Sequence, residues 1–146
     1  MLRQPYQAYK QQSVMTMTQA EMLTMLYDGI LKEVYLTKAA FAQDPLDIAE
    51  VNRSLQKAQR ILSYLKTSVD SNYDIAKNLY TLYDYCNWIL IQVNVKKETS
   101  RMDEVVDIIS QLRETYIQAD KSLRVHATEG ENKTQAYTHS ITDITG

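Results

Sequence analysis

Glycine and proline are scarce in this chain of 146 residues, which contains three glycines and two prolines. Average usage would supply about 10 glycines and about 7 prolines in a chain of this length. Folds rich in β-strands need these residues at their many turns. The shortage therefore argues against a β or α/β fold and favours a single domain built from long helices.

Cysteine, long apolar runs and excess charge are also missing. The single cysteine, Cys86, excludes an intrachain disulfide and is typical of a reducing compartment. No apolar run approaches the ~20 residues that cross a bilayer, and the first residues lack the apolar segment of a signal peptide. A net charge of −2 gives no general attraction to nucleic acid or to anionic lipid. We expect a cytoplasmic protein that binds no nucleic acid and does not insert into a membrane.

Apolar residues recur at helical spacing along most of the chain. Thr18, with Glu21 three residues later, forms a capping box that predicts the start of a first helix, and Pro45 predicts its end. Asp44 or Asp47 can cap a second helix. Its apolar residues follow steps of four and three, which are typical of a helix in a bundle: Val51, Leu55, Ala58, Leu62, Leu65 and Val69.

Two further helices follow, separated by polar segments at 70–74 and 96–103. The apolar pattern is lost from about residue 128. Short connections between helices of similar length predict an all-α fold, an antiparallel up-down four-helix bundle. The bundle is expected over residues 18–127, between an N-terminal arm at 1–17 and a polar C-terminal tail at 128–146.

The pair Asp28-Gly29 stands inside the first predicted helix, although this dipeptide usually favours a hairpin turn. A glycine within a helix costs about 1 kcal/mol relative to alanine. Because glycine has no side chain, it also allows another part of the chain to come close. We expect a second element to pack against Gly29.

Residues for catalysis are not grouped in this sequence. The Glu-x-x-His pairs of di-metal bundles and glycine-rich phosphate loops are absent. Cys86 falls on the predicted core face of the third helix, where a buried thiol is expected. We therefore expect no enzyme, no metal and no cofactor. His126, near the end of the last helix, leaves open the alternative of a phosphotransfer or signalling bundle.

The third helix carries a second stripe beside its core face, made of Ala76, Tyr80, Tyr83, Asn87, Leu90 and Asn94. On the second helix, Ile61 and Tyr64 lie outside the core pattern, and the chain contains 11 tyrosines and six methionines. These residue types suit adaptable, half-exposed contact surfaces. The wide face is therefore either core, a groove for an amphipathic partner helix, or the interface of a homodimer.

Several segments together resemble the flagellar secretion chaperone FliS family. They are "PYQAYKQQSVMT" (5–16), "LTMLYDGIL" (23–31), "SLQKAQRIL" (54–62), "NLYTLYDYCNWIL" (78–90) and "VVDIISQLRETYIQA" (105–119). The resemblance covers roughly residues 4–125. The chain departs from the family pattern at Met17-Thr18-Gln19, at the segment "DSNYD" (70–74), and at Tyr116, where the family usually has tryptophan.

The resemblance implies a non-enzymatic helical bundle that binds the disordered C-terminal segment of flagellin, prevents early polymerisation and delivers flagellin to the flagellar type III export gate. It also implies an N-terminal arm, with Tyr6 and Tyr9 at motif positions, that covers apolar surface when no client is bound. A regulatory co-chaperone is a further candidate partner. We expect the client to contact two helices through Ile61, Tyr64, Leu65, Tyr80, Tyr83, Asn87 and Leu90.

Overall fold

The computed structural model describes residues 17–69 and 74–127, and within these ranges the chain forms four helices and no strand. The helices are α2 (Gln19–Phe41), α3 (Ile48–Ser68), α4 (Asp74–Lys96) and α5 (Met102–Ala127). The predicted all-α fold is confirmed. The segments 1–16 and 128–146, which hold most of the predicted arm and the predicted tail, lie outside the described residues.

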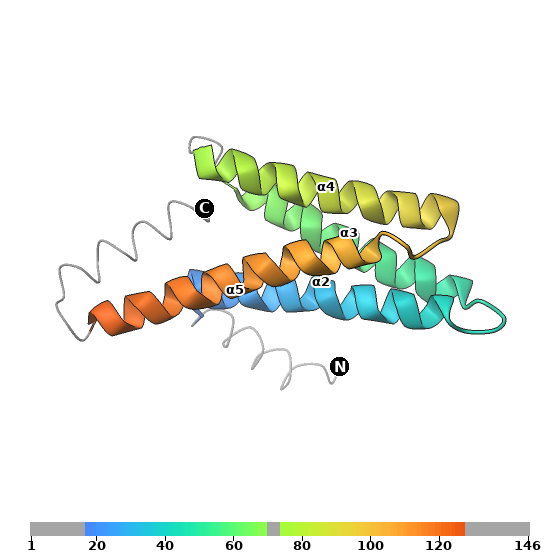
Figure 1. Ribbon diagram of the computed structural model, residues 1–146, viewed down its shortest axis with the longest axis horizontal. Coiled ribbons are helices and arrows are strands. Elements are labelled where there is room, and N and C mark those ends of the chain that lie inside the picture. The colour runs from blue at the N-terminus through green and yellow to red at the C-terminus, as the bar shows by residue number, and fades with distance from the viewer. Residues whose placement is uncertain (1–16, 70–73, 128–146) are drawn as a thin grey trace, which may run out of the picture.

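Each helix packs against its neighbour in sequence, and α5 returns to pack against α2, so the four helices close into a bundle (Figure 1). The interface between α4 and α5 is the smallest of the four. In Figure 1, α3 with α4 and α2 with α5 form two pairs that diverge toward the end of the bundle where α4 begins.

Two predicted caps define the starts of α2 and α3. The Thr18 side chain accepts a hydrogen bond from the backbone N–H of Glu21 at 3.1 Å, as the capping box predicts. Asp47 caps α3 in the same way, accepting from the backbone N–H of Glu50 at 3.1 Å. Each cap satisfies a backbone donor that has no partner within its helix.

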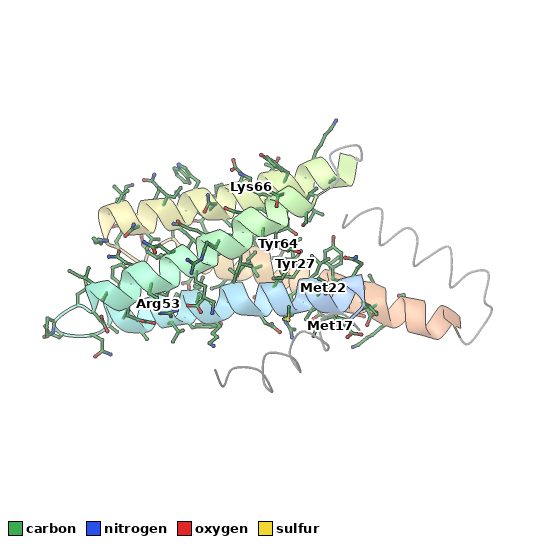
Figure 2. The ribbon with its side chains drawn as sticks, turned by 180° about the vertical axis from the view of Figure 1, so that it is seen from behind. Met17, Met22, Tyr27, Arg53, Tyr64 and Lys66 are labelled. Carbon is green, nitrogen blue, oxygen red and sulfur yellow. The ribbon has the colours of Figure 1, made fainter. Side chains whose placement is uncertain are left out.

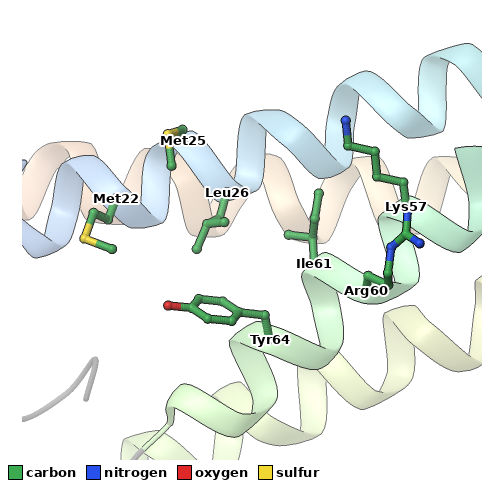
Figure 3. Close-up of a pocket in the computed structure, with 7 residues that line it drawn as sticks. All are labelled: Met22, Met25, Leu26, Lys57, Arg60, Ile61 and Tyr64. Carbon is green, nitrogen blue, oxygen red and sulfur yellow. The ribbon is translucent and has the colours of Figure 1, made fainter. Parts of the chain in front are cut away.

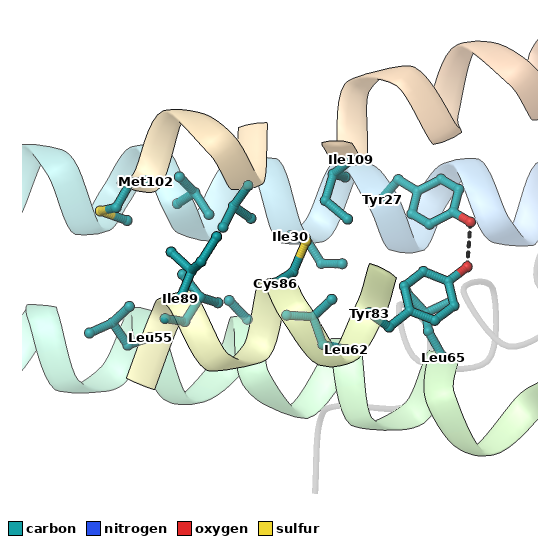
Figure 4. Close-up of a cluster of buried hydrophobic side chains, with 14 of the residues drawn as sticks. Tyr27, Ile30, Leu55, Leu62, Leu65, Tyr83, Cys86, Ile89, Met102 and Ile109 are labelled. Atoms are coloured by element: carbon teal, nitrogen blue, oxygen red, sulfur yellow. Dashed lines mark hydrogen bonds between the residues drawn. The ribbon is translucent and has the colours of Figure 1, made fainter. Parts of the chain in front are cut away.

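The core lies where the predicted apolar faces meet. The predicted apolar face of the second helix, from Val51 to Val69, is confirmed on α3. All of its residues are buried except Val69, which is partly buried. The largest fully buried apolar side chains come from all four helices: Tyr27, Ile30, Leu55, Leu62, Leu65, Tyr83, Ile89, Leu90, Met102 and Ile109 (Figure 4). Burial of this apolar area is the main force that stabilises the bundle.

Asp28-Gly29 forms no turn and lies within α2. A side chain at Gly29 would place its Cβ 3.1 Å from Cδ1 of Ile61 on α3, so the missing side chain lets these two helices approach closely. Asp28 points to the other side and forms an ion pair with Arg113 of α5. The expected packing against Gly29 is confirmed, and the packing element is α3.

A pair of tyrosine hydroxyls joins the two helix pairs inside the core. The hydroxyls of Tyr27 on α2 and Tyr83 on α4 are 2.6 Å apart, and the ring of Tyr116 on α5 lies 6.1 Å from that of Tyr27 (Figure 4). Burial raises the pKa of both Tyr27 and Tyr83, so the hydroxyls remain neutral at physiological pH. One hydroxyl donates to the other, so a single hydrogen bond links the two side chains inside the core.

Removing one of these hydroxyls leaves the other buried without this partner. We expect Tyr27→Phe and Tyr83→Phe each to lower the free energy of unfolding by about 1–2 kcal/mol, and the double variant to lose less than the sum of the two. Urea denaturation followed by circular dichroism measures all three values. Strictly additive losses would show that the two hydroxyls do not depend on each other.

Cys86 is fully buried between the helices, and this burial raises the pKa of its thiol to about 12. Since the thiolate is the reactive form, we expect iodoacetamide to modify the native protein slowly at mildly alkaline pH and the guanidinium-unfolded protein rapidly. Mass spectrometry of samples taken over time measures both rates. Equal rates in the two states would contradict the buried position.

Candidate client-binding site

A groove lies on the surface between α2 and α3, toward the end where α2 begins. Its volume is about 400 Å³, and its lining is mostly apolar (Figure 3): Met22, Met25 and Leu26 from α2, with Lys57, Arg60, Ile61 and Tyr64 from α3. We refer to it as the α2–α3 groove. In Figure 3 the two helices separate from Ile61 toward Met22, and Leu26 and Tyr64 project into the space between them.

The local sequence explains why this surface is apolar. Met22, Met25 and Leu26 are spaced three and four residues apart and therefore share one side of α2. Ile61 and Tyr64 form the facing side of α3, and Tyr64 is 55% exposed. Figure 2 shows Tyr64 and Met22 on these neighbouring helices from behind. Unbranched methionine side chains can adjust to the shape of different partners.

The other end of the groove is cationic. Lys57 lies 3.5 Å from Glu33, and Arg53 lies 2.9 Å from the same carboxylate, which is almost completely buried. Arg53 donates hydrogen bonds to the carboxylates of Glu50 and Glu33, and these hydrogen bonds raise the pKa of its guanidinium. Glu33 is therefore held between two cations that tie α2 to α3. Arg60 also lines the groove but has no anionic partner among the described residues.

A second, polar hollow lies on the other side of the exposed ridge of α3. Its volume is about 410 Å³, and it is lined by Gln56, Gln59, Arg60 and Ser63 of α3 and by Asn87 of α4. Arg60 lines both this polar hollow and the α2–α3 groove. The two depressions therefore meet at one side chain.

The structure separates the predicted contact residues into two groups. Ile61 and Tyr64 line the α2–α3 groove, and Asn87 lines the polar hollow. Tyr80 is 48% exposed on α4, where Lys66 lies 4.9 Å above its ring. These four side chains lie at the surface or border a hollow.

Three other predicted contact residues, Leu65, Tyr83 and Leu90, do not lie at the surface of the described structure. Leu65 and Leu90 are 0% exposed and Tyr83 is 1% exposed. The reason is geometric: α4 packs against both α3 and α5, so it buries a broad arc that includes part of its second stripe. Among the described residues, the hollow between α2 and α3 has a mostly apolar lining, whereas the one between α3 and α4 has a polar lining.

Other predicted positions lie beyond what the structure describes. Tyr6 and Tyr9 fall in the segment 1–16, and only the backbone of α5 is described at His126. Within residues 17–69 and 74–127, no group of three or more His, Cys, Asp or Glu side chains could hold a metal ion. None of the described helices is long and apolar enough to span a membrane.

Sequence reasoning missed five residues of the α2–α3 groove: Met22, Met25, Leu26, Lys57 and Arg60. The available signal was the spacing of Met22, Met25 and Leu26, which repeats on one side of the first helix. The sequence analysis also did not predict the exposed outer face of α4, which carries Tyr85, Trp88, Ile91 and Val95. There, Arg101 lies 5.0 Å above the ring of Trp88.

Comparison with known proteins gives a consistent result. The family model described as "Flagellar protein FliS" matches residues 2–123. The flagellar secretion chaperone FliS of Bacillus subtilis is 35% identical over 123 residues, covering 84% of this chain and 91% of the relative. The proteins of the same name from Vibrio cholerae and Escherichia coli are each 31% identical, covering 80% and 75% of this chain and 89% and 85% of their own lengths. The chain therefore belongs to the FliS family of flagellar secretion chaperones.

Proposed function

We propose that this protein is a cytoplasmic export chaperone that binds the disordered C-terminal segment of flagellin, prevents its premature polymerisation and delivers it to the flagellar type III export apparatus. The observation that carries the proposal is the exposed, methionine-rich α2–α3 groove. The membership of the FliS family supports it, since the relatives are named flagellar secretion chaperones.

The groove has the composition that an amphipathic client helix requires. Met22, Leu26, Ile61 and Tyr64 offer apolar area on two sides, and the client places its own apolar face between them. A segment that folds on binding must offset its lost conformational entropy with buried area, at about 25 cal/mol per Å² of apolar surface. The α2–α3 groove supplies such apolar area without a deep pocket.

The N-terminal arm is the natural cover for this groove when no client is bound. Met22 lies in the first turns of α2, and residues 1–16 precede this helix directly. In our proposal Tyr6 and Tyr9 occupy part of the groove and the client displaces them. This arrangement protects the exposed methionines from nonspecific association.

The outer face of α4 remains available while a client occupies the groove. Tyr85, Trp88, Ile91 and Val95 form an exposed apolar surface on that helix. Exposed apolar patches on soluble proteins commonly mark contact sites. We assign this face to the later partners of the chaperone, namely the export gate or a regulatory co-chaperone.

The proposal predicts that a charge in the groove prevents client binding. We expect Tyr64→Asp to weaken binding of a C-terminal flagellin peptide at least ~10-fold, because large aromatic side chains dominate interface energies. Tyr35→Asp is the matched control. Like Tyr64 of α3, Tyr35 of α2 is exposed, at 57%, but it lines neither the groove nor the polar hollow.

Isothermal titration calorimetry measures the affinities, and circular dichroism measures the helix that the peptide gains on binding. Both variants change exposed side chains, so thermal denaturation should show both folded. Equal affinities for Tyr64→Asp, Tyr35→Asp and the unaltered protein would exclude the α2–α3 groove as the client site.

A further inference from the structure

Methionine is concentrated around the start of α2. Four of the six methionines of the chain fall between residues 15 and 25, and two of them, Met22 and Met25, line the α2–α3 groove. The proposed function uses these two side chains only as apolar area. Leucine would supply similar area and would lose less conformational entropy when a client orders it. The thioether sulfur therefore adds a chemical property that apolar contact alone does not require.

The two groove methionines are open to solvent, whereas a methionine of the core is not. Met25 is 37% exposed and Met22 is partly exposed. Figure 3 shows both side chains on α2, at the end of the groove toward which the ring of Tyr64 extends. Met102 of α5 is 0% exposed and belongs to the hydrophobic core. A small oxidant in water therefore reaches the groove methionines, while the folded bundle protects Met102.

A peroxide converts an exposed methionine to methionine sulfoxide in one step. A lone pair of the thioether sulfur attacks one oxygen of hydrogen peroxide, and the O–O bond breaks as the new S–O bond forms. The proton of the transferred oxygen passes to the leaving hydroxide, which departs as water. The sulfur is oxidised by two electrons, and the peroxide is reduced. The product is a polar side chain, and methionine sulfoxide reductases convert it back to methionine.

We propose that Met22 and Met25 form a reversible oxidation site that controls client binding. A peroxide oxidises both side chains and thereby closes the α2–α3 groove to the client, and enzymatic reduction of the sulfoxides opens it again. This inference rests on the proposed function, because the client is the one assigned to that groove.

A sulfoxide is tolerated in the free chaperone but not beneath a bound client. In the free protein its oxygen remains hydrated, because both side chains reach solvent. In the complex the apolar face of the client covers it and removes this water. Among the residues that line the groove, Leu26 and Ile61 have no side-chain donor, and the cations lie at the other end from Met22 (Figure 3). The Tyr64 hydroxyl has a single proton and serves at most one of the two sulfoxides.

Peptide mapping by mass spectrometry after treatment with hydrogen peroxide tests the site. We expect Met22 and Met25 each to gain one oxygen in the folded protein, and Met102 to react only after unfolding in guanidinium. A C-terminal flagellin peptide should slow oxidation of Met22 and Met25, because the bound client covers them. Equal rates at these two positions with and without bound peptide would overturn the inference.

Isothermal titration calorimetry with the reduced and the oxidised protein tests the effect on binding. We expect oxidation to weaken binding of the flagellin peptide at least ~10-fold, in the range of a polar group buried without a partner. The thermal midpoint of the free chaperone should stay the same, since the sulfoxides are hydrated there. Treatment with methionine sulfoxide reductases should restore the affinity. An affinity that does not change when both methionines are oxidised would contradict the proposal.

The double variant Met22→Leu/Met25→Leu assigns the effect to the groove. Each variant is compared with its own untreated form, so a change in its basal affinity does not affect the result. Peroxide should no longer weaken peptide binding by the double variant. It should still weaken binding by Met17→Leu, which removes a methionine that does not line the groove. A double variant that remains sensitive to peroxide would place the effect at another residue and refute the proposed site.

These experiments separate the inference from the proposed function. If the reduced, unaltered protein binds no flagellin peptide, the proposed function fails and the inference fails with it. If that protein binds the peptide equally well before and after oxidation, only the inference fails, and the α2–α3 groove remains the client site.

Discussion

The contact between α2 and α3 at Gly29 determines where this protein offers apolar surface. Ile61 approaches so closely there that a Cβ on Gly29 would lie 3.1 Å from its Cδ1. Further along α2, Glu33 forms ion pairs with Arg53 and Lys57 of α3, and these contacts hold the two helices together. Two helices that touch at these points and separate toward the start of α2 leave side chains without partners. The α2–α3 groove is that unfilled space.

In the core, tyrosine side chains link the two helix pairs. The hydroxyl pair of Tyr27 and Tyr83 joins α2 to α4, and the ring of Tyr116 lies beside Tyr27. Three tyrosines from α2, α4 and α5 thereby meet in the core. Because buried hydroxyls must be paired, this contact specifies one arrangement of the helices more strictly than three phenylalanines would. The core is therefore well defined beneath an adaptable surface of methionines.

This combination suits a chaperone whose client becomes ordered only on binding. In the proposed function the client undergoes the conformational change, while the bundle provides a preformed surface and loses little entropy of its own. The apolar groove and the polar hollow meet at Arg60, so one ridge of α3 separates two depressions of different chemistry. The exposed residues on the outer face of α4, including Trp88, line neither depression.

Local patterns in the sequence determined the helices, their caps and most of the core, because helical periodicity and cap chemistry act over a few residues. Thr18, Asp47 and the apolar face of α3 were predictable for this reason. The family was also recognisable from its motifs. Tertiary packing alone decided which second-stripe residues are exposed: it buried Tyr83 and Leu90 and left Tyr80 at the surface. It also placed the groove beside α2, since the angle and depth at which helices meet depend on contacts between residues far apart in the chain.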